Sequence, residues 1–484
     1  MKECPLLYIV LKTGFGGRKM ELLNRIDQFV WGQWLLFLLL GTGVLLMVRM
    51  DFLPLRRLGF ALKCIVGAEK KEKKARNGVS PFASLMTELA ATIGIGNIVG
   101  VATAMVLGGP GALFWMVAAS VLGLATKLVE SALSVKYRCK NDKGEWVGGP
   151  MYTLKHAFPG KVGIILAGSY AFLAVMASFG MGNMTQSNSI AQACLVTFQI
   201  PTARTGLVIT LLTIFAVLGG IRGITKITQI LVPFMGIFYL LGTLAVILLH
   251  PVGLLQGVGA IVTMAFAPEA VKGGLFGQLT VMASLSMAKS MRFGISRGVF
   301  SNEAGVGAAG ITAAATDTED YIRQGYISMT GVFFDTMIIC LFTGLAFAAS
   351  GLLGSVTADG ELLNGTELAV AVFEGTFGAW GAKFVCVSIV LFAFATIVAW
   401  AYQGEKAFEY LTGGRYSVWY RFVYVLVVFL GAVCSLELVW DFSDICNGLM
   451  AVPNLLSVLA LGLGRNGMCE EILRYDSTRY EHNR

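Results

Sequence analysis

The chain has 484 residues, of which 56% are hydrophobic and only 14% are charged, and its mean hydropathy is +0.72. Soluble domains carry about 25% charged residues, so this composition excludes an ordinary soluble protein and indicates an integral membrane protein. The net charge is +8, but the basic residues are gathered in alternate loops rather than on one surface, which argues against a nucleic-acid partner.

Apolar runs of about 20 residues recur along the chain, whereas period-two alternation is rare, a pattern typical of membrane helices rather than a β-barrel. We therefore predict an all-α integral membrane protein with about eleven transmembrane helices, surrounded by membrane lipids. The nine cysteines form no CxxC pair and the three histidines are far apart, so no metal site and no cofactor is expected. The expected spans are 30–48, 83–107, 111–135, 162–193, 205–219, 228–249, 275–299, 326–352, 382–404, 418–435 and 443–463.

Basic residues alternate between the loops that join these spans. The loop 49–80 holds nine Lys and Arg residues, and the loops on the same side hold between two and six each. The loops on the other side hold only Arg204, Lys272 and Lys383. Because basic residues stay on the cytoplasmic side, we expect 464–484 to be a cytoplasmic tail. The odd number of spans then places the N-terminus outside, in a cell membrane of the bacterial type.

The first 29 residues form an N-terminal extension that breaks this pattern. Five Lys and Arg residues lie within the first 25 positions, on the side expected to be external. Translation from Met20 rather than Met1 would remove most of the conflict and leave one external base, Arg25. A signal peptide is the alternative, but the apolar stretch CPLLYIVL is short and lacks a good cleavage site.

The span 83–107 carries glycines and an amide at its centre. Glycine is about 1 kcal/mol less favourable than alanine in a helix, yet Gly94, Gly96 and Gly100 lie here beside Asn97. A helix broken at this depth exposes main-chain groups, which is tolerated where they line a cavity and can bind an anion or a cation. The spacing of Gly96 and Gly100 is also that of close helix packing, and the residues alone leave both interpretations open.

Eleven spans divide into one helix followed by two groups of five. Because five is an odd number, two such groups in series have opposite orientations, as in inverted-repeat transporters. We therefore expect a transporter domain over 30–463, with one five-helix repeat at 83–249 and the second at 275–463. The halves show no clear sequence identity, so the repeat is inferred from counting.

Six stretches of the chain are long and distinctive: AATIGIGNIVGVATAMVLGGPGALFWM, GGPMYTLKHAF, GNMTQSNSIA, RFGISRGVFSNEAGVGAA, GVFFDTM and FAFATIVAWAYQGEKAFEYL. They resemble the motifs of the alanine/glycine:cation symporters, also called sodium:alanine symporters, from about residue 25 to 463. The resemblance implies the amino acid–polyamine–organocation superfamily and the fold of the bacterial leucine transporter, with one extra N-terminal helix. It also implies sodium-coupled import of small neutral amino acids, mainly alanine and often glycine, by alternating access.

The resemblance places the substrate at the middle of the membrane. Main-chain N–H groups around Thr92, Gly94, Gly96 and Asn97 are expected to hold its carboxylate. Gln186, in the GNMTQ motif, is expected to contact the amino acid directly. An amide that only bridges two helices is the alternative for Gln186.

The span 382–404 is expected to supply sodium ligands and one wall of the substrate pocket. The Thr396 hydroxyl is the best side-chain oxygen for sodium, a hard cation, with carbonyl groups of Gly94 and Ala393 as its partners. Trp400, one helical turn further on, is expected to line the substrate pocket, with an interfacial tryptophan as the alternative.

A second broken helix is expected in the span 275–299. Its break is placed near Ser284–Met287, with Met287 at the substrate, although no glycine marks the position. The stretch RFGISRGVFSNEAG is expected to leave the membrane on the cytoplasmic side. Arg292, Arg297 and Glu303 would then form ion pairs of the inner gate.

Four further charged residues fall inside predicted spans, where each costs about 2.5–3.5 kcal/mol or more at the membrane centre. They are Glu88, Lys127, Glu130 and Asp335. Lys127 and Glu130 are three residues apart and are expected to pair. Asp335, in GVFFDTM, is expected to couple to gating, and a structural pair with a basic residue is the alternative.

Two positions depart from the family pattern. Ile95 replaces the second threonine of TIGTGNI, and Ala395 replaces the serine of FAFST beside Thr396. Both changes remove a hydroxyl near the expected sites, so we expect weaker sodium affinity than in typical members, or a water in place of one ligand. Because these two hydroxyl groups are missing, coupling to protons instead of sodium stays open as the alternative. A channel is less favoured because channels usually assemble a symmetric pore, and no catalytic constellation is found, so no enzyme is expected.

Overall fold

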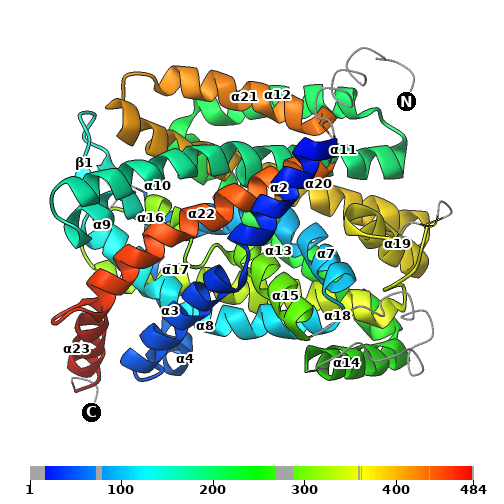
Figure 1. The fold of residues 1–484 in the computed structure, drawn as a ribbon, viewed down its shortest axis with the longest axis horizontal. Helices are drawn as coiled ribbons and strands as arrows, with labels where there is room; N and C mark the ends of the chain where they lie inside the picture. The colour runs from blue at the N-terminus through cyan, green and yellow to red at the C-terminus, as the bar shows by residue number, and fades with distance from the viewer. Residues whose placement is uncertain are drawn as a thin grey trace.

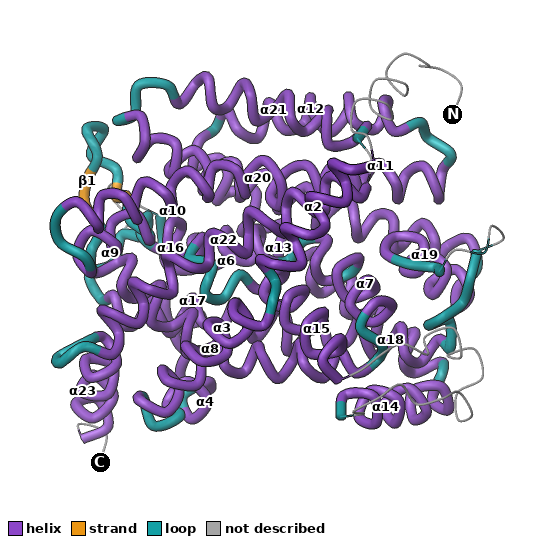
Figure 2. Tube along the Cα trace, viewed as in Figure 1, coloured by secondary structure: helices purple, strands orange, loops and turns teal. Residues whose placement is uncertain are grey.

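The computed structural model describes residues 17–71, 79–266, 287–357, 360, 362–434 and 436–481, and helices dominate this part of the chain (Figure 1, Figure 2). The first elements are α2 (Gly17–Val30), α3 (Gln33–Arg49), α4 (Leu53–Arg56), α5 (Leu58–Lys71), α6 (Pro81–Thr92), the 3₁₀ turn η1 (Ile95–Asn97), α7 (Val99–Leu107) and α8 (Gly111–Lys136). There follow the strands β1 (Cys139–Lys140) and β2 (Trp146–Val147), α9 (Pro150–Ala157), α10 (Lys161–Phe179), the π-helical η2 (Gly180–Met184), α11 (Thr185–Phe198), α12 (Thr202–Leu218), α13 (Gly220–Leu249) and α14 (Pro251–Ala265). The remaining elements are α15 (Met287–Asn302), α16 (Ala308–Ala313), α17 (Tyr321–Val332), the π-helical η4 (Phe333–Cys340), α18 (Leu341–Ser350), α19 (Gly365–Phe377), α20 (Ala379–Thr412), α21 (Ser417–Val433), α22 (Leu436–Leu463) and α23 (Met468–Glu481).

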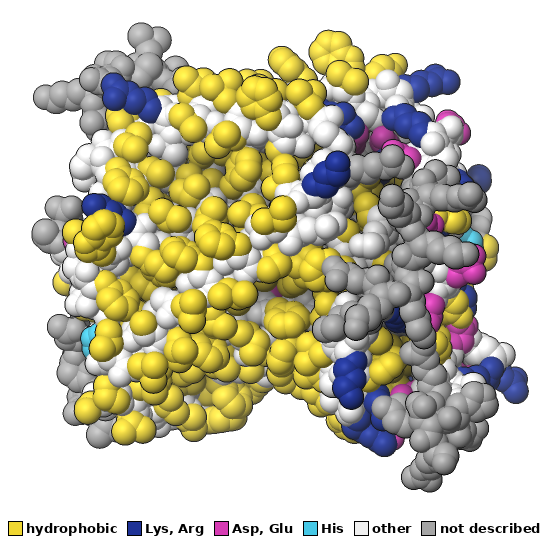
Figure 3. Space-filling view, turned by 180° about the vertical axis from the view of Figure 1, so that it is seen from behind, with side chains coloured by type: hydrophobic (Ala, Val, Ile, Leu, Met, Phe, Trp, Pro, Cys, Tyr) yellow, Lys and Arg dark blue, Asp and Glu magenta, His cyan; other side chains and the backbone are white. Residues whose placement is uncertain are grey.

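Helices suited to a bilayer run through the described chain. Seven helical segments have the length and apolar composition to cross it, and the shorter apolar helices α12 and α21 and two interrupted helices bring the crossings to eleven. Exposed side chains on them are largely apolar, such as Phe215, Ile230 and Trp380. Figure 3 shows a broad apolar face with charged side chains gathered mainly at its lateral edges. The predicted all-α membrane fold is confirmed, and the protein crosses the membrane several times.

The helix α14 lies between two predicted spans and does not add a crossing. Near its start, a Cβ at Gly253 would lie 2.1 Å from the Ala349 carbonyl oxygen, at the end of α18. At its other end, the Ala265 carbonyl accepts a hydrogen bond from Trp115 Nε1 (2.9 Å), near the start of α8. Both ends of α14 are therefore fixed where α18 finishes and α8 begins.

The span predicted at 83–107 is interrupted, as its glycines indicate. The helix α6 ends at Thr92, and Gly94 leaves the helical conformation with φ −127° and ψ −151°. The single turn η1 then separates α6 from α7. A Cβ at Gly94 would lie 2.4 Å from Thr396 Oγ1, so the close approach of α20 requires glycine at this position.

A second interruption lies between α15 and α16. The chain passes through Glu303–Gly307 with φ of +55° at Glu303 and +88° at both Gly305 and Gly307, angles that glycine adopts easily. The break was expected near Ser284–Met287, of which residues 284–286 lie outside the described chain. Met287 itself opens α15, and the described break follows the whole of this sixteen-residue helix.

The two interrupted helices run past each other in opposite directions. At one end, Ser290 Oγ of α15 donates to the carbonyl of Gly108, just after α7 (2.6 Å). At the other end, the N–H of Val79, just before α6, donates to the carbonyl of Ala315, just after α16 (3.2 Å).

The two breaks meet at the middle of this antiparallel pair. A Cβ at Gly96 in η1 would lie 3.1 Å from Ser301 Cα, near the end of α15. Opposite directions and facing breaks are what an inverted repeat produces. The domain boundaries predicted at 83–249 and 275–463 stay predictions.

The expectation that RFGISRGVFSNEAG leaves the membrane on the same side as the 49–80 loop is therefore wrong. Arg292 and Arg297 lie in α15, at the end where α7 finishes, whereas the basic 49–80 loop leads into α6 at the opposite end. They do form ion pairs, Arg292 with Asp27 (3.6 Å) and Arg297 with both carboxylate oxygens of Asp444. The glycines of SNEAGVG break a helix inside the protein and do not begin a loop outside the membrane. A part for Arg292, Arg297 and Glu303 in a gate stays a prediction.

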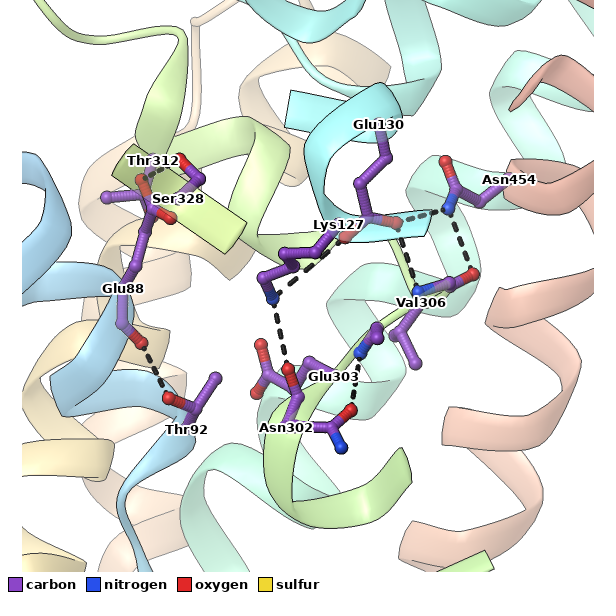
Figure 4. A network of polar contacts seen from close by, with 12 residues as sticks. Glu88, Thr92, Lys127, Glu130, Asn302, Glu303, Val306, Thr312, Ser328 and Asn454 are labelled. Atoms are coloured by element: carbon purple, nitrogen blue, oxygen red, sulfur yellow. Dashed lines mark hydrogen bonds and ion pairs between the residues drawn. The ribbon is translucent and has the colours of Figure 1, made fainter. Parts of the chain in front are cut away.

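The second break is held by a buried ion pair from α8. Lys127 Nζ donates to the carbonyl of Asn302 (3.1 Å), while Glu130 Oε2 accepts from the Gly305 N–H (3.1 Å) and from Asn454 Nδ2 (3.0 Å) (Figure 4). The ammonium group thus meets the negative end of α15, and the carboxylate meets a free main-chain donor ahead of α16, as helix dipoles favour. Lys127 Nζ and Glu130 Oε1 lie 3.9 Å apart, so the predicted pair is confirmed.

We expect Glu130→Gln to destabilise the protein by about 3–5 kcal/mol, the cost of removing one member of a buried ion pair. The reason is that Lys127 would keep its charge inside the membrane without a counter-charge. Thermal unfolding of the detergent-purified protein measures the loss, and the double variant Lys127→Met, Glu130→Gln should recover much of it. Asp51→Asn, which breaks an exposed pair with Arg56, is the control and should change little. An unaltered melting temperature in Glu130→Gln contradicts the role.

Candidate substrate and ion site

The first break is partly closed by side-chain acceptors. The N–H of Gly94 donates to Asn97 Oδ1 (3.0 Å), and the N–H of Ile95 donates to Gln186 Oε1 (3.2 Å). Gln186 Nε2 in turn donates to a main-chain carbonyl of η2 (3.0 Å). Gln186 therefore bridges two elements, the alternative considered for it, and its direct contact with a substrate stays a prediction. Within the described chain, the N–H of Gly96 is left without a hydrogen-bond partner.

A buried carboxylate joins the two breaks. Asp335, in η4, accepts from Asn97 Nδ2 (2.7 Å), Ser301 Oγ (2.9 Å) and Thr336 Oγ1 (2.7 Å). Asn97 belongs to the first break, and Ser301 lies next to the second. All of these donors are neutral, so a structural pair between Asp335 and a basic residue is not what the described chain contains. A part for Asp335 in gating stays a prediction.

The helix α20 brings Thr396 against the end of α6. Thr396 Oγ1 donates to the carbonyl of Ala90 (2.9 Å) and lies beside Gly94. Ala90 is in the last turn of α6, where carbonyl groups lack helical partners and a cation is favoured. Ala393, one turn earlier on α20, is fully buried. Oxygen atoms of two elements are thus gathered in a way that suits a hard cation such as Na⁺, and Gly94, Ala393 and Thr396 stay predictions as its ligands.

Trp400 lies one turn further along α20 and is fully buried. A Cβ at Gly182 would lie 2.4 Å from Trp400 Cβ, so the indole packs closely on η2. Trp400 Nε1 donates to Glu303 Oε1 (2.8 Å) in the second break. The side chain is therefore not an interfacial tryptophan. Glu303, expected in an ion pair of the inner gate, makes none among the described residues.

Two residues predicted at the substrate site, Thr92 and Met287, have other surroundings in the structure. Thr92 Oγ1 donates to the carbonyl of Glu88 (3.2 Å), one turn back in α6 (Figure 4). Met287 opens α15, and fifteen residues of helix place it about 22 Å from the second break. The structure therefore does not bring Met287 together with the other predicted residues.

Residues of both breaks and of α20 form a closed series of contacts and short steps along the chain, which we call the break circuit. Its four side chains are at most 1% exposed. Two cavities, of 370 and 290 Å³, lie elsewhere, at the β1–β2 hairpin and between α8, α14 and α18. The members of the break circuit, in order, are Gly94, Thr396, Trp400, Glu303, Ser301 and Gly96.

The prediction missed that Ser301 lies beside the first break and that Glu303 lies within the second. The signal was present, because SNEAGVG holds two glycines two residues apart, as TIGIG does. The basic residues before it suggested a cytoplasmic loop instead. Contacts such as that of Asn97 with Asp335 join residues 238 positions apart, and no local pattern marks them.

Comparisons with known proteins agree with this architecture. A model of the sodium:alanine symporter family matches residues 18–482. The sodium/alanine symporter AgcS of Methanococcus maripaludis is 43% identical over 442 residues, which cover 91% of this chain and 94% of the relative. The amino-acid carrier protein AlsT of Bacillus subtilis is 33% identical over 444 residues, 91% of this chain and 89% of the relative.

Among solved structures, MhsT in complex with L-phenylalanine superimposes with a TM-score of 0.58 at 13% identity, covering 82% of this chain and 95% of that chain. This likeness supports the expected leucine-transporter fold. The family match and the identity to its members cover nearly the whole chain, and the chain therefore belongs to the sodium:alanine symporter family of membrane transporters.

Proposed function

We propose that the protein imports small neutral amino acids, alanine and glycine, together with Na⁺ by alternating access. The observation that carries the proposal is the meeting of two helix breaks at Gly96 and Ser301. Broken helices present main-chain donors and acceptors at membrane depth, where a zwitterion and a cation can use them. The relatives named for sodium and alanine support the same function.

The substrate carboxylate and the sodium ion are attracted to opposite helix ends at the first break. The unpaired N–H of Gly96, ahead of α7, suits a carboxylate, because the N-terminal end of a helix favours negative charge. Thr396, with the carbonyl groups of Gly94 and Ala393, suits Na⁺ at the opposite, negative end of α6. The close approach of Thr396 and Gln186 to Gly94 leaves little space and favours a small side chain on the substrate.

Sodium supplies enough driving force for this work. One charge moving through 100 mV releases about 2.3 kcal/mol, and concentrating a neutral solute 100-fold costs about 2.7 kcal/mol. A modest sodium gradient supplies the difference.

Proton coupling is the second candidate. Three buried carboxyl groups lie at the two breaks, from Glu130, Glu303 and Asp335, and Lys127 is the buried base beside them. An excess of buried acids of this kind is typical of groups that bind protons or cations.

Uptake of labelled alanine into proteoliposomes tests the proposed function. We expect an inward sodium gradient to drive accumulation, while lithium or proton gradients, imposed separately, drive little. Counterflow should exchange labelled for unlabelled alanine, as a carrier does. Accumulation under a proton gradient alone would show that protons, not sodium, are the coupling ion. Flux that does not saturate with alanine would indicate a channel.

Gly94→Ala should reduce sodium-dependent uptake about 10-fold or more. The added Cβ would lie 2.4 Å from Thr396 Oγ1 and 3.1 Å from Gln186 Oε1, and overpacking of this kind costs about 1–3 kcal/mol. Gly41→Ala is the matched control, because a Cβ at Gly41 meets no atom within 4 Å. Equal uptake by the two variants would remove Gly94 from the site.

Ala395→Ser should lower the sodium concentration that gives half-maximal uptake, because it restores a hydroxyl beside Thr396. Ala401→Ser, which adds a hydroxyl to another face of α20, should leave this concentration unchanged. The dependence of initial uptake rate on sodium at fixed alanine gives the comparison. If both variants match the parent protein, position 395 is not an ion ligand.

A further inference from the structure

Glu303 is a buried carboxylate with an incomplete set of partners. Its side chain is fully buried, Oε1 accepts from Trp400 Nε1 (2.8 Å), and Oε2 has no hydrogen-bond partner in the described chain. Lys127, the buried base on α8, does not pair with it: Lys127 Nζ donates to the Asn302 carbonyl and faces Glu130. Lys127 is near enough to attract this carboxylate but forms no ion pair with it, so the open Oε2 can accept from a cation supplied from elsewhere.

The backbone at Glu303 points to the same conclusion. Its φ is +55°, a left-handed conformation that costs a non-glycine residue about 1–2 kcal/mol. The neighbouring Gly305 and Gly307 take positive φ without this cost. A strained residue that could be glycine but carries a charged side chain is typical of a binding position.

Glu303 also belongs to the break circuit. Trp400 connects it to Thr396 and so to Gly94, and Ser301 connects it to Gly96. In Figure 4 its side chain extends from the second break toward the side where Thr92 ends α6. The free donor of the first break and the free acceptor of the second thus belong to one closed set of contacts.

We propose that Glu303 binds the α-ammonium group of the substrate, while main-chain N–H groups at Gly96 hold its carboxylate. The inference rests on the proposed function and names the group that recognises the amino end. Glu303 Oε2 accepts a charge-assisted hydrogen bond from the ammonium group, while the indole N–H of Trp400 holds Oε1 in place.

An ammonium group fits this position better than Na⁺. Na⁺ needs several oxygen ligands at once, whereas Glu303 offers one open carboxylate oxygen beside an indole N–H donor. An ammonium group has three N–H donors, of which Glu303 Oε2 accepts one, while carbonyl groups freed by the helix breaks can accept the others. The oxygen atoms near Thr396 remain for the ion.

Competition between alanine and L-lactate tests the proposal, because lactate carries a hydroxyl in place of the ammonium group. Binding of both ligands to the full-length purified protein at saturating sodium gives a selectivity ratio. We expect Glu303→Gln to reduce the preference for alanine about 10- to 100-fold, the worth of a hydrogen bond to a charged group. Glu303→Asp keeps the charge and should retain most of the preference while binding alanine more weakly.

Glu88→Gln is the matched control. Glu88 is also buried and also has one carboxylate oxygen without a partner, but it contacts Ser84 and Ser328, outside the break circuit. Its substitution should leave the alanine-to-lactate ratio unchanged even if the protein becomes less stable.

The outcomes separate the two proposals. If Glu303→Gln weakens alanine and lactate equally, Glu303 only supports the fold, and the inference is wrong. If it changes the half-saturating sodium concentration but not the ratio, Glu303 binds the ion, and the ammonium assignment is wrong. If Glu303→Gln does not fold, Glu303→Asp provides the test. Loss of the preference for alanine over lactate in Glu303→Asp would overturn the ammonium assignment. Failure of the parent protein to bind alanine would instead overturn the proposed function.

Discussion

Main-chain groups in the interior of a bilayer need hydrogen-bond partners, and this requirement organises the structure around two broken helices. An unsatisfied N–H or C=O group there costs several kcal/mol. The partners at the first break are the amides Asn97 and Gln186, and those at the second are Lys127, Glu130 and Asn454. Most of these side chains come from other helices, so the breaks exist only in the assembled bundle.

The charges buried in the membrane follow from the same requirement. Lys127 and Glu130 replace helical hydrogen bonds on either side of the second break and neutralise each other as they do so. Asp335 collects neutral donors from both breaks and ties them together. One carboxylate oxygen stays without a hydrogen-bond partner on each of Glu88, Glu130 and Glu303 within the described chain.

The first break also shows how a ligand could shift the molecule between states. Gln186 and Asn97 occupy main-chain donors that an amino acid carboxylate would also use. A substrate that takes over these donors frees the two side chains and alters the contacts between α6, α11 and η4. A ligand changes a conformational equilibrium only through such differences in contact, and the proposed substrate would produce them at the first break.

The sequence by itself determined the membrane class, ten of the eleven expected spans and the first break, because hydropathy and helix-breaking glycines act locally. It also determined the Lys127–Glu130 pair, since residues three apart share a helix face. It misplaced the second break, because arginines ahead of SNEAGVG resemble a loop, and only the ion pairs to Asp27 and Asp444 show how those charges are neutralised inside the fold. The contacts of Gly96 with Ser301 and of Trp400 with Glu303 were decided by tertiary structure alone, because they join helices far apart in the chain whose relative position depends on the packing of the whole bundle.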